Sequence, residues 1–152
     1  MNKIIPTKVF LSEIFQEAND SQDPVSVLQS YRQKEIRLTS ILGYCIHPGF
    51  CIKNQIPDGE PPFKKTEYPM EKAIMNVLDL HNKLYIMMNP NLKRFKKEEF
   101  FVNWLESMHP TDAQILVAIK DQELDRLYPK LTKDVIRQSL GWTEEQYKSL
   151  FK

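Results

Sequence analysis

The stretch Ala113-Gln114-Ile115-Leu116-Val117-Ala118-Ile119 is apolar at six of its seven positions. A helix that is apolar on every side belongs in the interior of a domain, because a surface helix keeps a polar face. Thr111-Asp112-Ala113-Gln114 has the Ser/Thr-x-x-Glu/Gln form of a capping box. We therefore expect a helix that starts at this box and lies buried in the core.

Apolar residues at helical spacing predict further helices on both sides of this run. The longest stripe runs from Ile74 to Met88 and predicts one continuous helix. The next runs from Phe100 to Met108 and ends before Pro110. Shorter stripes run from Phe10 to Ala18, Val27 to Tyr31, Leu38 to Cys45, Val135 to Leu140 and Tyr147 to Phe151. No alternating stretch is long enough to predict a strand, so the expected fold is all-α, one compact domain over residues 1–152 with seven or eight helices.

Several short signals place the ends of these helices. Asp23-Pro24 is typical of an N-cap followed by proline at the first helical position. Thr132 is expected to cap a short helix that Gly141 stops. Thr143-Glu144-Glu145-Gln146 is a second capping box and starts a last helix. Residues 141–152 are therefore expected to form a C-terminal helical extension.

A proline-rich connection is expected between the third and fourth helices, over residues 47–69. Five of the ten prolines lie here, Asp58-Gly59 is a turn signal, and Pro61-Pro62 favours an extended path. A loop of this length is uncommon and often functional. The residues that we expect to contact a partner protein are Pro57, Asp58, Gly59, Pro61, Pro62 and Phe63. The alternative is an ordered internal connection that needs no partner.

Composition excludes several classes of protein. Lys and Arg total 21 against 20 Asp and Glu, so the net charge of +1 excludes a strongly basic nucleic-acid coat. Four glycines argue against a glycine-rich phosphate loop, and two cysteines are too few for a disulfide framework. The least polar stretch, from Ile41 to Ile52, has 12 residues. A membrane span needs about 20, so we expect a protein of the cytosol that does not enter the membrane.

No pattern in the chain predicts catalysis, a bound metal or a cofactor. Cys45-x-His47-x3-Cys51 offers three zinc-binding residues, but a structural site needs four in paired short spacings. Cys45 is better explained as a small apolar residue at a helix end. His81 lies on an apolar stripe with no recognisable nucleophile nearby. The carboxylates Asp121, Glu123 and Asp125 are expected to be solvated on an exposed loop.

The sharpest charge feature is Lys93-Arg94-Phe95-Lys96-Lys97, in which four cations flank one aromatic ring. Cations neutralise phosphates and aromatic rings stack on bases, so nucleic-acid binding is one hypothesis. Its candidate residues are Lys64, Lys65, Lys93, Arg94, Phe95, Lys96 and Lys97. The alternative is a solvated entry to a helix, because Glu98 and Glu99 follow at once.

Residues 132–151 have the outline of a helix-turn-helix motif. A second helix that reads DNA begins with side chains that contact bases. Here that helix begins with Glu144-Glu145, which repels phosphates. An ordinary helical hairpin is therefore the better interpretation.

The chain resembles a family of small proteins encoded by large contractile-tailed bacteriophages, the myoviruses and cyanophages. The segment Ile56-Pro57-Asp58-Gly59-Glu60-Pro61-Pro62-Phe63-Lys64 is similar to the family's Leu-Pro-x-Gly-x-Pro-Pro-Tyr-Lys stretch. Further matching pieces follow in order, namely Ala18-Asn19, Val27-Leu28-Gln29, Leu84-Tyr85, Asn91-Leu92-Lys93, Lys97-Glu98, Leu105-Glu106-Ser107, Asp112-Ala113, Lys120-Asp121 and Leu131-Thr132. The chain departs from the family pattern at residues 125–130 and in its C-terminal extension.

The resemblance implies a phage-encoded protein in the cytoplasm of the infected bacterial host, and it brings no activity with it. We therefore expect a non-catalytic accessory protein that binds a phage or host protein, with a contact surface formed by residues 57–69 and 93–97. The alternative is a nucleic-acid-binding factor of phage replication or late transcription that acts through the basic residues 93–97.

Overall fold

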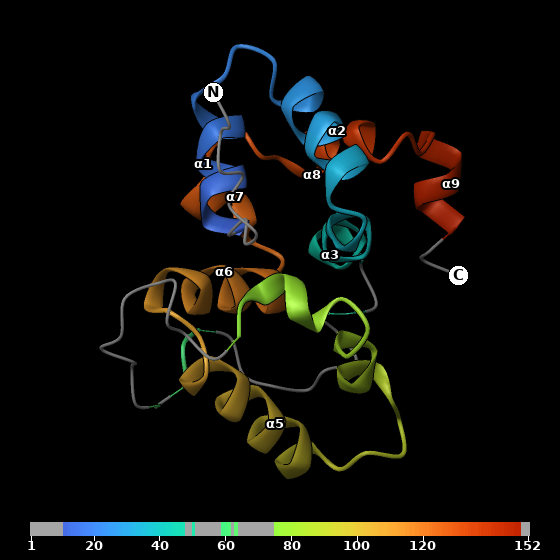
Figure 1. Ribbon diagram of the computed structural model, residues 1–152. Helices are drawn as coiled ribbons and strands as arrows, with labels where there is room; N and C mark the ends of the chain where they lie inside the picture. The colour runs from blue at the N-terminus through green and yellow to red at the C-terminus, as the bar shows by residue number, and fades with distance from the viewer. Residues whose placement is uncertain (1–10, 48–49, 51–58, 62, 64–74, 150–152) are drawn as a thin grey trace.

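The computed structural model describes residues 11–47, 50, 59–61, 63 and 75–149. Within these residues the fold is all-α and contains no strand, and a single isolated bridge joins Met75 to Met108 (Figure 1). The α-helices are α1 (Leu11–Asp20), α2 (Pro24–Lys34), α3 (Arg37–Ile46), α5 (Arg94–Glu106), α6 (Pro110–Asp121), α7 (Leu124–Leu127), α8 (Lys133–Ser139) and α9 (Glu144–Lys148). Two short 3₁₀ helices, η2 (Val77–Leu80) and η3 (Leu84–Met88), complete the set. The predicted fold class is confirmed.

Helix α6 is the central element of the core. Figure 1 shows it crossing the middle of the fold, between α5 and the group formed by α1, α2 and α3. It contacts α1, α3, α5, α7 and η2, and all its residues from Ile115 to Lys120 are buried. The apolar run that predicted a buried helix therefore identified the element around which the others pack.

The start of α6 differs from the sequence prediction. His109 is the N-cap, and its Nδ1 accepts a hydrogen bond from the Thr111 N–H at 3.1 Å. Pro110 takes the first helical position, where its fixed φ and missing N–H are tolerated. The capping box expected at Thr111 was therefore wrong, because proline and its preceding histidine start the helix two residues earlier.

The long helix expected from Ile74 to Met88 was also wrong over the residues that the structure describes. The chain forms η2 and η3 instead, separated by a turn at residues 81–83. The N–H groups of Asp79, His81 and Lys83 bond to carbonyls three residues back rather than four. Apolar residues three apart line one side of both kinds of helix, so the spacing alone did not distinguish them.

Three helix starts meet at the buried carboxylate of Asp112. Asp112 lies in the first turn of α6 and is fully buried. The backbone N–H groups of Ser12, in the first turn of α1, and of Val77, at the start of η2, favour its charged form. Neither carboxylate oxygen completes a hydrogen bond to another described residue. Burial is the larger effect and raises the pKa of Asp112 to about 6, with the Glu13 and Asp79 carboxylates adding to it.

This raised pKa predicts how stability depends on pH. Between the unfolded value of 3.8 and about 6, the folded chain holds a proton on Asp112 that the unfolded chain has lost. The free energy of unfolding therefore falls as pH rises through this window, by about 3 kcal/mol in total. Asp112→Asn should remove that loss and be at least as stable as the parent at pH 7, as measured by denaturant unfolding at several pH values.

The exposed Gln114 on the same helix supplies the control, since Gln114→Ala changes no titratable group and should keep the parent's dependence of stability on pH. The opposite result, Asp112→Asn being clearly less stable than the parent at pH 7, would mean that the helix starts stabilise the charge more than burial opposes it.

The C-terminal part of the chain packs on α2 and α3. Helix α8 contacts both, and Leu131, Ile136 and Leu140 join the buried core. The Arg32 Nη1 donates a hydrogen bond to the Ser139 carbonyl at 2.6 Å. The predicted side-chain caps Asp23, Thr132 and Thr143 are all confirmed at the starts of α2, α8 and α9. Residues 131–140 are therefore part of the core rather than an appendage.

Replacement of Ile136 by alanine tests this role of α8. Ile136 is 1% exposed, so Ile136→Ala should lower the free energy of unfolding by about 2–5 kcal/mol through lost burial and a cavity. Leu127→Ala removes an apolar side chain that is 37% exposed and should cost less than about 1 kcal/mol. Equal effects of the two substitutions in denaturant unfolding would contradict the packing described for α8.

Candidate protein-binding surface on α5

Helix α5 lies at the edge of the fold (Figure 1), and two of its aromatic side chains are exposed to solvent. Phe95 is 60% exposed and Phe100 is 39% exposed, with the Phe100 ring 6.2 Å from the ring of Trp104. The sequence placed Phe100 on the inward stripe, which was wrong, because Phe101, Trp104 and Leu105 fill that side. We call the exposed residues Lys93 to Lys96, Glu99, Phe100, Asn103 and Glu106 together the α5 face. Phe95 and Phe100 are five positions apart and therefore lie on either side of the row formed by Lys96, Glu99, Asn103 and Glu106.

Lys97 does not belong to the α5 face. Its side chain is 1% exposed and lies on the inward side with Phe101 and Trp104. Burial lowers the pKa of Lys97. Lys97 precedes Phe101 by four residues, so the two side chains lie on the same side of the helix. This spacing is the feature of the sequence from which the inward position of Lys97 could have been predicted. The assignment of Lys97 to a nucleic-acid-binding patch was therefore wrong.

The exposed cations of α5 are paired with acids on the same helix. The Arg94 Nε lies 3.0 Å from the Glu98 Oε1, and the Lys96 Nζ lies 3.4 Å from the Glu99 Oε2. The Lys96 Nζ also lies 5.9 Å from the centre of the Phe95 ring. Lys64 and Lys65, the other predicted phosphate-binding residues, lie outside the described part of the chain. The α5 face thus carries charges of both signs around its aromatic rings.

Two described points of the proline-rich connection are held against the fold. The Gly59 N–H donates a hydrogen bond to the Asp121 Oδ2 at 2.9 Å, and Gly59 has a φ of +89°, which favours glycine. Phe63 is half-buried and packs on the core. Of the other residues predicted to contact a partner, Pro61 is described and is half-buried. Pro57, Asp58 and Pro62 lie outside the described residues.

Asp121 is not the solvated carboxylate that the sequence suggested. Its side chain is 3% exposed and lies 2.5 Å from the Nζ of Lys120, which is also buried. The Lys120 Nζ lies 5.8 Å from the centre of the Phe101 ring on α5. The expectation for Asp121 was wrong because the Gly59 turn covers it, while Glu123 and Asp125 are exposed as expected.

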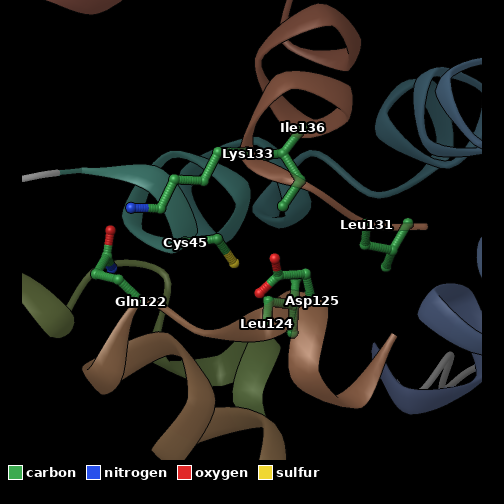
Figure 2. Close-up of a pocket in the computed structure, with 7 residues that line it drawn as sticks. All are labelled: Cys45, Gln122, Leu124, Asp125, Leu131, Lys133 and Ile136. Carbon is green, nitrogen blue, oxygen red and sulfur yellow. The ribbon is translucent and has the colours of Figure 1, made fainter. Parts of the chain in front are cut away.

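A small cavity lies between α3, α7 and α8 (Figure 2). Its volume of about 10 Å³ is near that needed for one water molecule. Figure 2 shows the sulfur of Cys45 and the carboxylate of Asp125 pointing into it. Burial raises the pKa of the Cys45 thiol, so the thiol stays protonated at neutral pH and is a poor nucleophile. This cavity has room for no substrate.

Other candidate sites of the sequence are placed as follows. Cys45 is buried in the core, while Cys51, the other cysteine of the Cys45-x-His47-x3-Cys51 pattern, lies outside the described residues. Among the residues described, no three His, Cys, Asp or Glu side chains gather as metal ligands would. His81 is half-buried, and its Nδ1 lies 3.2 Å from the Leu78 carbonyl oxygen. None of the described helices has the length and apolarity that crossing a membrane requires.

The buried position of Lys97 gives a direct test of the α5 assignments. Lys97→Ala should lower the free energy of unfolding by about 1–3 kcal/mol, because the packing of its aliphatic stem is lost. Lys96→Ala, one residue along on the exposed side, should change it by less than about 0.5 kcal/mol. Chemical denaturation of both variants measures the difference, and a neutral Lys97→Ala would place Lys97 outside the core.

Comparison with known proteins identifies a family. Residues 11–126 match the model of a family of unknown function, DUF6433. No curated protein and no solved structure shows significant similarity to the chain. The matched segment includes the central helix α6, the α5 face and the three helix starts that meet at Asp112, and it stops before α8. Because the match covers more than half of the chain, the protein is a member of the family DUF6433.

Proposed function

We propose that this chain is a non-catalytic phage accessory protein that acts by binding a phage or host protein through the α5 face. The observation that carries the proposal is the exposure of Phe95 and Phe100 on one helix, 60% and 39% respectively. Aromatic side chains are enriched at the centres of protein interfaces, where they lose most of their contact with water. Charged neighbours of both signs form the polar rim that such interfaces have.

The same residues favour a protein over nucleic acid as the partner. Binding to nucleic acid gains its free energy mainly from cations that neutralise several phosphates. Arg94 and Lys96 already lie beside carboxylates, and Lys97 is buried. A phosphate chain would approach Glu98 and Glu99 together with the cations. The α5 face is therefore better suited to a partner that has apolar groups and charges of both signs.

The phage origin and the location in the host cytoplasm are part of this proposal. They rest on the resemblance of the segment around Pro57-Asp58-Gly59 to proteins of contractile-tailed phages. The structure supplies a reason for that pattern, since Gly59 bonds to Asp121 within the Lys120-Asp121 pair that the resemblance also includes. The two matching pieces form one structural contact.

A pull-down from infected-cell lysate, with and without nuclease, tests the proposal. The tagged parent should retain a phage or host protein in stoichiometric amount after nuclease treatment. Phe95→Ser should lose most of it, because the exposed ring no longer fills a pocket on the partner. Ile36→Ser is the matched control, since Ile36 is an exposed apolar residue on another element, and it should retain the partner.

Two outcomes would contradict the proposal. Recovery of nucleic acid, with every associated protein lost on nuclease treatment, would favour the phosphate-binding hypothesis for Lys93, Arg94 and Lys96. Equal recovery of the protein by the parent and by Phe95→Ser would place the binding surface elsewhere on the molecule.

A further inference from the structure

We propose that the pocket between α8 and α9 binds a nucleoside monophosphate, whose phosphate lies among Lys133, Arg137 and Lys148. This site is distinct from the α5 face and does not rest on the proposed function. Figure 1 shows α9 at the edge of the fold and far from α5. The pocket lies within residues 133–148, beyond the segment that matches the family model.

The pocket is open to solvent and has a volume of about 330 Å³. Small-molecule sites in proteins have volumes of about 300–1,000 Å³, so one small ligand fills it. The residues that line it are Lys133, Asp134, Arg137, Glu144, Tyr147 and Lys148. Side chains four residues apart lie on the same side of a helix. Helix α8 therefore directs Lys133 and Arg137 toward the pocket, and α9 directs Glu144 and Lys148 toward it.

The guanidinium group of Arg137 is held in place by the protein itself. Its Nη2 donates a hydrogen bond to the Asp134 Oδ1 at 2.7 Å, and its Nη1 donates one to the Trp142 carbonyl at 2.7 Å. The Arg137 side chain is 14% exposed. A guanidinium has five N–H donors in a planar arrangement that suits phosphate. Because this group is already fixed, its further hydrogen bonds to a ligand cost little side-chain entropy.

Lys133 and Lys148 supply positive charge that the protein does not neutralise. Asp134, by contrast, is paired with Arg137, and the hydrogen bond from Arg137 lowers the pKa of Asp134. Both lysines are exposed, and neither forms an ion pair with another residue that the structure describes. Two such cations beside a fixed guanidinium favour binding of a phosphate group, which carries up to two negative charges.

The walls of the pocket are fixed by contacts between α8 and α9. The Trp142 N–H donates a hydrogen bond to the Arg137 carbonyl at 3.2 Å. Gly141 has a φ of +74°, which favours glycine and turns the chain between the two helices. The capping box of Thr143 and Gln146 fixes the start of α9. The two charged pairs therefore face the pocket before a ligand binds.

Tyr147 and Glu144 favour a nucleoside over a simple anion. Tyr147 is half-buried and packs against the core, so its ring forms a wall on which a nucleobase can stack. Glu144 is exposed and accepts hydrogen bonds from hydroxyl or amino groups of a ligand. Its charge also repels additional phosphates, so a ligand with one phosphate is favoured over a polynucleotide.

Isothermal titration calorimetry of the full-length protein with the ribonucleoside 5′-monophosphates tests the proposal. At least one of them should bind, and inorganic phosphate and the free nucleosides should bind more weakly. Lys133→Gln and Lys148→Gln should each weaken nucleotide binding by about tenfold, because each removes a charge-assisted hydrogen bond to phosphate. Lys83→Gln is the matched control, since Lys83 is exposed and lies outside the pocket, and it should bind as the parent does.

Glu144→Ala tests the recognition of the nucleoside. This variant should bind inorganic phosphate at least as tightly as the parent does, because a negative charge is removed. It should also lose part of the parent's preference for the nucleotide over inorganic phosphate. Circular dichroism should show the parent's helix content in every variant, since all the replaced side chains are exposed.

Several outcomes would overturn the inference. These are no binding at millimolar nucleotide, equal affinity of the parent and both lysine variants, and inorganic phosphate binding as tightly as every nucleotide. Binding of O-phosphotyrosine but of no nucleotide would also overturn it, because the pocket would then take phosphorylated side chains of proteins. None of these results bears on the α5 face, whose own test is the pull-down with Phe95→Ser.

Discussion

The stability of the fold depends on pH through one buried carboxyl group at the point where three helices begin. Asp112 is fully buried in the first turn of α6, and α1 and η2 direct the N–H groups of Ser12 and Val77 toward it. A buried charge without hydrogen-bond partners is unfavourable, whereas helix starts favour a negative charge. The raised pKa of Asp112, about 6, indicates that burial outweighs the helix starts. The protonation of this one group therefore decides how much stability the junction of α1, η2 and α6 loses as pH rises.

Much of this architecture is predictable from local sequence. The apolar run in α6 identified the central helix, and Asp23, Thr132 and Thr143 identified helix starts, because each depends on neighbouring residues alone. The prediction of one continuous helix was wrong for Val77 to Met88, because i, i+3 hydrogen bonds and a turn at residues 81–83 replace it. Its apolar spacing fits both structures, and the choice depends on packing against α3 and α6.

The candidate site was less predictable, because charge alone does not reveal which side of a helix a residue occupies. Lys97 looked like its neighbours in a basic run, yet its side chain is buried on the side with Phe101 and Trp104. Asp121 looked like a loop carboxylate, yet it accepts a hydrogen bond from Gly59, 62 residues earlier in the chain. Tertiary contacts decide both cases. What remains exposed on α5 is a mixed-charge face with two aromatic rings, which is the basis for the proposed protein binding.

The most direct test of the central role of Asp112 is a carbon-13 NMR titration of its side-chain carboxyl in the folded protein, assigned by comparison with Asp112→Asn. The structure predicts a midpoint near pH 6, well above the ordinary aspartate value of 3.8. A midpoint at or below 3.8 would contradict the account, because it would show that the helix starts of α1, η2 and α6 stabilise the charge fully despite its burial.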